Sequence, residues 1–230
     1  MLEKILTCER DAFLWLNGGH TPYLDRLMWL YSGKAVWLPL AVFILFLLIY
    51  KTKWREWLLI LLSIVLVITL CDQFASHLCK PVFTRFRPTH HPDFMDQVQI
   101  AFNYRGGLYG FMSSHAANAF GFATLMAFLF RNRLFTITIF FWALVTAYSR
   151  IYLGVHFISD IVPGAMIGLL FVYLVYRLYV KVRSAVIPGA DRLPPEALYS
   201  GRRKQTIVYA ILLTVLVLLL FNEPLVEWLR

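Results

Sequence analysis

Charge is scarce in this chain of 230 residues: 15% are Asp, Glu, Lys or Arg, whereas 60% are hydrophobic. A soluble domain usually has about 25% charged residues to cover its surface. The shortage of charge therefore excludes an ordinary soluble globular protein, and the high apolar content excludes a disordered chain. Lipid is the expected solvent for much of the surface, so the lipid bilayer is an expected partner.

Cysteine is also scarce, and the chain has no internal repeat or low-complexity tract. Three cysteines, Cys8, Cys71 and Cys79, form no even disulfide framework. Charged residues interrupt the first apolar stretch, so the N-terminal segment is not expected to be a signal peptide. His90-His91 has no Cys or carboxylate at ligand spacing beside it. We therefore expect no disulfide, no metal site and no other cofactor.

Apolar runs dominate what is present, and they predict an all-α polytopic membrane protein with six transmembrane helices. The expected spans are residues 35–50, 56–79, 114–130, 134–149, 160–180 and 206–221. Before them, residues 2–16 and a short helix begun by Thr21-Pro22 are amphipathic, which is typical of helices lying in the membrane interface. The sequence thus predicts an interfacial part, residues 1–33, and a six-span core, residues 34–230.

Six spans divide the connecting segments between two sides of a membrane. Side A carries both termini and the loops 80–113 and 150–159, and side B carries residues 51–55, 131–133 and 177–205. Twelve of the 22 basic residues are on side B. This bias is slight, but it sharpens when Lys80, Arg87 and Arg150 of side A are set aside as candidate site residues. The positive-inside rule then places side B in the cytoplasm. The net charge of +9 is explained by cytoplasmic loops and anionic headgroups, and nucleic acid is not an expected partner.

Three polar clusters interrupt the apolar pattern, and all three fall on side A. They are Lys80 to Pro88, then Ser113-Ser114-His115, and then Ser149-Arg150 followed by His156 and Asp160. Lys80, Arg87 and Arg150 supply cations suited to phosphate oxygens, with Arg85 as a further candidate. Ser113 and Ser114 open a helix whose free N–H groups form an anion site. The clusters together predict a phosphate-binding cage.

Two histidines add reactivity to this cage. His156 and Asp160 are four residues apart, so they share one face of a helix. A carboxylate on one ring nitrogen fixes the tautomer and leaves the other nitrogen free to attack phosphorus. His115 is then placed to protonate the leaving alkoxide.

Taken together, these clusters resemble the three signatures of the type 2 phosphatidic acid phosphatase superfamily. The matching segments are Lys80-(six residues)-Arg87-Pro88, Ser113-Ser114-His115, and Ser149-Arg150-(five residues)-His156-(three residues)-Asp160. The resemblance implies that His156 is a nucleophile forming a phosphohistidine, Asp160 its partner and His115 the general acid. It also implies a metal-free reaction. The residues implied to hold the phosphate are Lys80, Arg87, Ser113, Ser114 and Arg150. Met112 and Ser114 depart from the family's usual proline and glycine.

The expected function is that of a bacterial inner-membrane enzyme that hydrolyses a phosphate monoester or pyrophosphate of a lipid, with its site facing the periplasm. Undecaprenyl pyrophosphate, lipid A phosphates, phosphatidylglycerophosphate and phosphatidic acid all fit this chemistry. Two alternatives remain open: a lipid phosphotransferase using the same intermediate, and a non-catalytic lipid-phosphate binder or transporter. The sequence defines no oligomeric state.

Overall fold

The computed structural model describes residues 2–230, and this part of the chain is helical with no β-strand. The expected all-α membrane architecture is confirmed. The α-helices are α1 (Leu2–Asn17), α2 (Pro22–Ser32), α3 (Leu38–Ile49), α4 (Trp54–Gln73), α5 (Lys80–Phe83), α6 (Ser114–Phe130), α7 (Arg133–Tyr152), α8 (Ile158–Val186), α9 (Gly201–Leu220) and α10 (Asn222–Leu229). A π-helical turn, Phe74–Cys79, joins α4 to α5.

Four described helices are long and apolar enough to cross a membrane: Trp54–Phe83, which includes α4 and α5, and then α7, α8 and α9. A fifth span arises if α2 and residues 35–49 are one span bent by 67°. By itself α3 has only 12 residues and rises about 18 Å, less than the roughly 30 Å of a hydrocarbon core. With 17 residues, α6 is also short. The chain is therefore multi-pass, and the count of six spans stays a prediction.

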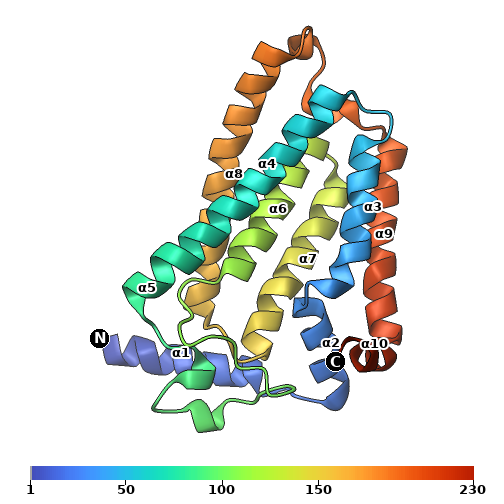
Figure 1. Cartoon of the computed structure of the whole chain (residues 1–230). Helices are drawn as coiled ribbons and strands as arrows, with labels where there is room; N and C mark the ends of the chain where they lie inside the picture. Colours follow the sequence, from blue (N-terminus) through green and yellow to red (C-terminus); the bar gives the residue numbers. More distant parts are fainter. Residues whose placement is uncertain (1) are drawn as a thin grey trace.

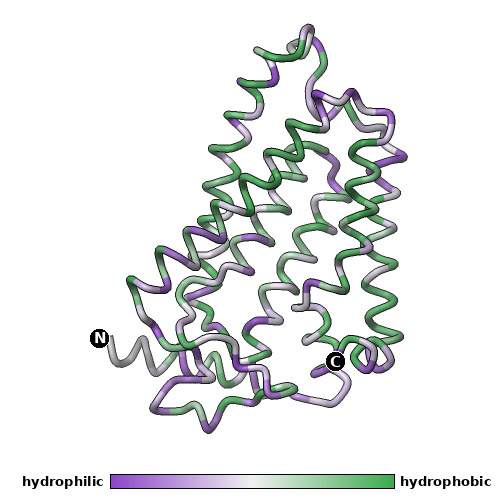
Figure 2. The backbone as a smooth tube through the Cα atoms, in the orientation of Figure 1, coloured by the Kyte–Doolittle hydropathy of each residue, from purple (hydrophilic) through white to green (hydrophobic). Residues whose placement is uncertain are grey.

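The helices form one elongated bundle with a polar group of segments at each end (Figure 1). The lower end in that view carries α1, α2, α10 and the long connection between α5 and α6, and the upper end carries the α3–α4 and α8–α9 connections. Figure 2 shows hydrophilic residues gathered toward these ends and hydrophobic residues along the helices between them. The segments expected on side A thus share one end, and those expected on side B share the other.

Small residues let α6 and α8 approach closely where they cross. A Cβ added to Gly168 of α8 would lie 2.4 Å from the carbonyl oxygen of Ala117, and one added to Gly164 would lie 2.6 Å from that of Ser113. Close approach of this kind is typical of small residues spaced four apart in membrane helices. The N–H of Ser113 donates to the carbonyl oxygen of Asp160 at 3.0 Å. The crossing therefore fixes the start of α6 beside the start of α8.

Gly168→Ala should destabilise the protein by about 1–3 kcal/mol, because the new methyl group meets backbone atoms that cannot turn aside. Thermal unfolding in detergent measures the effect. Gly201→Ala is the matched control, because a Cβ at Gly201 has no atom within 4 Å. Equal melting temperatures for the two variants would show that the α6–α8 contact is looser than described.

A buried ion pair ties α4 to α8 at the side B end. Arg183 donates from Nε and Nη2 to the two carboxylate oxygens of Glu56, both at 2.8 Å, and both side chains are buried. A third nitrogen of Arg183 donates to the carbonyl oxygen of Ala190. Arg183 is therefore a structural cation, and it adds little to the positive surface that the sequence predicts on side B.

The two N-terminal helices have the predicted amphipathic character, and the rest of the chain covers part of their apolar faces. Phe13 of α1 is fully buried and meets the ring of Phe157 edge-on, with 5.4 Å between the ring centroids. Trp15 of the same helix is 81% exposed. Leu30 of α2 packs in a cluster with Leu218 of α9. These helices therefore close the side A end of the bundle as well as being suited to the interface.

Candidate active site

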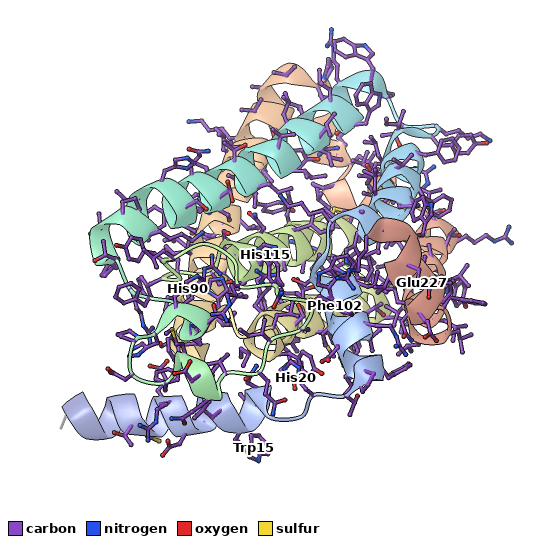
Figure 3. The ribbon with its side chains drawn as sticks, turned by 60° about the horizontal axis from the view of Figure 1, so that its bottom comes forward. Trp15, His20, His90, Phe102, His115 and Glu227 are labelled. Atoms are coloured by element: carbon purple, nitrogen blue, oxygen red, sulfur yellow. The ribbon has the colours of Figure 1, made fainter. Side chains whose placement is uncertain are left out.

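The side chains singled out in the sequence come from five segments that meet at the side A end. Lys80 begins α5, Arg87 follows it in the connection to α6, and Arg150 lies in the last turn of α7. The second residue of α6 is His115. Figure 3 turns this end toward the viewer, with His115 near its centre and α1 along its lower edge. The α6–α8 crossing and the turn between α7 and α8 bring these segments together.

His156 and Asp160 form a buried pair in the turn that leads into α8. The ring Nδ1 lies 3.3 Å from Oδ2 of Asp160, and the two side chains are 1% and 0% exposed. The same oxygen accepts the N–H of Phe157 at 2.9 Å. A carboxylate at the third helical position commonly caps a helix in this way. The cap holds Asp160 in place, and Asp160 in turn orients His156.

Arg87 lies against the other nitrogen of His156. Its Nη1 is 3.2 Å from Nε2 of the ring and 3.0 Å from the carbonyl oxygen of Val155, and its Nε donates to the carbonyl oxygen of Tyr109. A guanidinium group only donates, so Nε2 is the acceptor and the proton is on Nδ1, toward Asp160. This tautomer is the one that presents a nitrogen lone pair to an electrophile.

Burial and nearby positive charge keep His156 neutral. Desolvation, followed by the charges of Arg87, Arg150 and Lys80, lowers the pKa of His156 well below its usual value of 6.5. The ring therefore retains its lone pair at neutral pH. Burial and the charge of Arg150 lower the pKa of Arg87 to about 10, which leaves this side chain a cation. The pair thus combines a neutral nucleophile with a fixed positive charge.

Arg150 is the most deeply buried cation of the site, at 3% exposure. It donates to the hydroxyl groups of Ser32 and Tyr104, and its Nε has no partner among the described residues. Among the described side chains, no carboxylate forms an ion pair with Arg150 or Arg87. A buried cation without a counter-charge is costly, and an anion removes that cost. The two guanidinium groups therefore define an anion site beside Nε2 of His156.

Lys80 ends a polar stripe on the long helix formed by α4 and α5. Its Nζ donates to the hydroxyl of Ser76 at 3.1 Å, and Ser76 donates to Asp72 at 3.5 Å. The four-residue spacing of these three residues predicts one shared face, and the contacts confirm it. The stripe holds Lys80 at the end of the helix, where its charge acts on both Arg87 and His156.

The start of α6 supplies backbone donors. The hydroxyl of Ser113 accepts the N–H of Ala116 at 3.3 Å and so caps the helix, which leaves its own proton free to donate. The N–H groups of Ser114 and His115 have no partner among the described residues, as is usual in a first helical turn. Burial, followed by the charges of Arg150, His156, Lys34 and Arg87, lowers the pKa of His115 well below its usual value. His115 therefore faces the same cationic region as His156, and an anion bound there favours its protonated form.

Arg85 has a different position from the cage cations. Its Nη1 donates to Oδ1 of Asp160 at 2.9 Å, its Nη2 to Glu9 of α1 at 2.8 Å, and its guanidinium group lies over the ring of Phe157. Two carboxylates neutralise it, so Arg85 is not a further phosphate cation. It supports the far side of Asp160.

Several residues of the site have no signal in the sequence. Ser32, Tyr104 and Glu9 reach it from segments that carry none of the three motifs. Gly106, at a positive φ of 67°, and Gly110 both lie against Arg87, since an added Cβ would approach its side chain to 3.3 and 3.2 Å. These two glycines make room for the Arg87 side chain.

Whether a metal ion could bind depends on how the described side chains that could ligate an ion are grouped. Among the side chains that the structure describes, no three of His, Cys, Asp or Glu are grouped so that they could hold a metal ion. The charges that face His156 come from Lys80, Arg87 and Arg150. An anionic group is therefore the ligand that these side chains fit.

Comparison with known proteins identifies relatives along almost the whole chain. A family model described as the PAP2 superfamily matches residues 57–184. The chain is 40% identical to a lipid A 4′-phosphatase of Porphyromonas gingivalis, over 100% of this chain and 97% of the relative. It is 32% identical to a lipid A 4′-phosphatase of Bacteroides thetaiotaomicron, over 96% and 98%.

Two solved structures are similar in fold. The crystal structure of Aquifex aeolicus LpxE has a TM-score of 0.51 and 26% identity, covering 73% of this chain and 93% of that one. A PAP2-type phosphatidylglycerolphosphate phosphatase from Bacillus subtilis has a TM-score of 0.59 and 24% identity, covering 79% and 89%. The second likeness concerns the fold alone.

Proposed function

Because this chain belongs to the PAP2 superfamily and is a membrane lipid phosphatase, we propose that it hydrolyses the 4′-phosphate monoester of lipid A through a phosphohistidine on His156. One observation carries the chemistry: Nε2 of a neutral, buried His156 lies 3.2 Å from a guanidinium group that has no carboxylate partner. The names of the two relatives, which align over nearly their whole lengths, support the choice of substrate.

The reaction begins when the phosphate dianion enters the cage. Arg87, Arg150 and Lys80 bind its oxygens, and Nε2 of His156 attacks phosphorus from the side opposite the sugar oxygen. A P–N bond forms and the P–O bond to the sugar breaks. His115, which takes up a proton as the phosphate dianion enters the cage, gives that proton to the leaving oxygen. Asp160 stabilises the positive charge that develops on the His156 ring.

Water completes the cycle. His115, now unprotonated, removes a proton from a water molecule that attacks the phosphohistidine. The new P–O bond forms, the P–N bond breaks, and inorganic phosphate leaves with His156 neutral again. Each residue returns to its starting protonation state, so no further reactant is needed.

The location of the site suits a lipid substrate. The cage lies at one end of the helical bundle, where the polar segments gather (Figure 2). The acyl chains of a lipid can then stay in the bilayer while its phosphate enters the cage. We place this end in the periplasm and the protein in the inner membrane, because the loops of the opposite end carry the larger share of Lys and Arg.

This orientation predicts the labelling of two engineered cysteines in a background without Cys8, Cys71 and Cys79. Asp93→Cys, in the connection before α6, should react with an impermeant maleimide added to cells whose inner membrane is intact. Arg202→Cys, at the start of α9, should react only after that membrane is permeabilised. The opposite pattern would place the site in the cytoplasm and contradict the proposed orientation.

EDTA should leave the rate of phosphate release unchanged. Three cations and the first turn of α6 already stabilise the charge of the transferring phosphate, which is the task that a metal ion performs in other phosphatases. The test compares initial rates of the purified protein with and without EDTA. Inhibition by EDTA that magnesium reverses would contradict the proposed mechanism.

Initial rates against a panel of lipid phosphates test the substrate. Purified protein in detergent should release phosphate from lipid A faster than from phosphatidylglycerophosphate, phosphatidic acid and undecaprenyl pyrophosphate. Equal or faster release from one of the other three lipids would refute lipid A as the preferred substrate.

A further inference from the structure

An apolar cavity of about 340 Å³ lies between α3, α4, α6, α7 and α9. All of its lining side chains are hydrophobic. Ala41 and Ile44 of α3 form one wall, and Ile64 and Ile68 of α4 form the wall opposite. Figure 1 shows α4 crossing the bundle obliquely to α3, so that the two helices diverge along their length. Ile68 is 39% exposed, so the cavity opens toward the region that hydrocarbon occupies in a membrane.

A short stretch of chain connects this cavity to the phosphate cage. Trp37, which lines the cavity, donates from Nε1 to the carbonyl oxygen of Tyr31 at 2.8 Å. The next residue, Ser32, accepts a hydrogen bond from Arg150 of the cage. Lys34, between Ser32 and Trp37, acts electrostatically on His115. The chain from Ser32 to Trp37 therefore runs from the cage to the lining of the cavity.

We propose that this cavity holds one acyl chain of the lipid substrate while its phosphate lies in the cage. The proposal rests on the proposed function and names the subsite that recognises the lipid tail. The volume is ample, since an engineered apolar cavity of about 150 Å³ already binds benzene. Walls formed almost entirely by apolar atoms accept hydrocarbon and reject water, so an acyl chain is the occupant that fits.

Ala41→Phe tests the proposal, because the new ring projects into the cavity. Val42→Phe is the matched control: Val42 is the next residue of α3, is 59% exposed and does not line the cavity. The substrates are lipid A and an acyl-free sugar, glucosamine 4-phosphate. Ala41→Phe should raise KM for lipid A about tenfold or more and leave kcat/KM for the acyl-free sugar unchanged. Val42→Phe should change neither. Ile68→Phe on the opposite wall is a second filling variant and should behave like Ala41→Phe.

Three results would overturn the proposal. If KM for lipid A is unchanged in both filling variants while the wild type is active, the cavity does not hold the substrate's tail. If both substrates slow equally and the melting temperature falls, the cavity holds a structural lipid. If the wild type releases no phosphate from lipid A, the proposed function fails, and the assignment of this tail fails with it.

An independent set of contacts links α1 to the catalytic pair. Oε2 of Glu9 pairs with Arg85 at 2.8 Å, and Arg85 pairs with Oδ1 of Asp160 at 2.9 Å. The other oxygen of Glu9 accepts the N–H of Ser159 at 3.1 Å and also contacts the Ser159 hydroxyl. Glu9 therefore holds both Arg85 and the first turn of α8, on which Asp160 sits.

We infer that Glu9 and Arg85 are positioning residues that keep the carboxylate of Asp160 turned toward His156. Asp160 has two oxygens: one is shared by His156 and the helix cap, and Arg85 fixes the other. Without Glu9, Arg85 loses the contact that keeps its guanidinium group in this place. The carboxylate then loses its orientation, although the phosphate cations are untouched.

Glu9→Gln should therefore lower kcat about tenfold and leave KM unchanged. A tenfold loss corresponds to an interaction free energy that is usual between residues of one hydrogen-bonded network. Asp11→Asn makes the same charge change on α1 at a residue that pairs with the exposed Arg10, and it should have no effect. The double variant Glu9→Gln with Arg85→Gln should lower kcat no more than Arg85→Gln alone. Arg85→Lys should retain a higher kcat than Arg85→Gln. Additive losses, or a lower melting temperature with an unchanged kcat, would overturn the inference.

Discussion

His156→Ala is expected to reduce the rate of phosphate release from lipid A by at least about 10³-fold. Removal of a catalytic nucleophile lowers the rate about as much as removal of all the catalytic residues that act with it. No other described side chain places a neutral nitrogen beside Arg87 in the same way. The measurement is the initial rate of phosphate release by purified protein. Lipid binding should persist, since Lys80, Arg87 and Arg150 are retained.

Two comparisons separate loss of chemistry from loss of fold. His90→Ala removes a histidine of the neighbouring loop and should leave both the rate and the melting temperature unchanged. Mass spectrometry of wild-type protein quenched in alkali during turnover should find phosphate on His156, and the His156→Ala protein should carry none. A His156→Ala enzyme that keeps more than a few per cent of the wild-type rate would contradict the role of nucleophile.

His115→Ala should reduce hydrolysis of the lipid A monoester about 10²–10⁴-fold, the usual contribution of a general acid. The sugar alkoxide is a poor leaving group and needs a proton as the P–O bond breaks. A pyrophosphate lipid releases a phosphate, which leaves with less need of a proton, so its loss of rate should be smaller.

The ratio of the two losses is the decisive quantity. Rates on lipid A and on undecaprenyl pyrophosphate are measured with the same His115→Ala preparation, so differences in folding cancel. Equal losses on both substrates would contradict the general-acid role and would assign His115 to binding of the phosphate.

Local spacing explains why so much of the site is predictable from sequence. His156 and Asp160 are four residues apart at the start of α8, so one helical turn brings them together. Likewise Asp72, Ser76 and Lys80 follow one helix face. The three clusters are expected to meet on side A because successive membrane crossings alternate in direction. In the structure the three clusters do lie at one end of the bundle. These features depend on helical geometry, which a sequence pattern encodes directly.

Long-range contacts explain what the sequence does not disclose. Glu9 looks like one of several charges on an amphipathic helix, and only the packing of Phe13 against Phe157 brings it to Arg85. Arg85 belongs to the same run as Lys80 and Arg87, so composition alone groups it with the phosphate cations. The expected span 35–50 matches the helical residues 35–49, but the 67° bend that relates this segment to α2 has no signal in an apolar run.

The central claim is that this protein hydrolyses one defined phosphate of lipid A. Mass spectrometry with fragmentation of lipid A, after incubation with purified protein in EDTA, tests it most directly. The account predicts loss of a single phosphate, from the 4′ position, with an equal amount of inorganic phosphate released by the wild type and none by His156→Ala. Loss of the phosphate at the other end of the disaccharide, or its transfer to a second lipid without release of inorganic phosphate, would contradict the account.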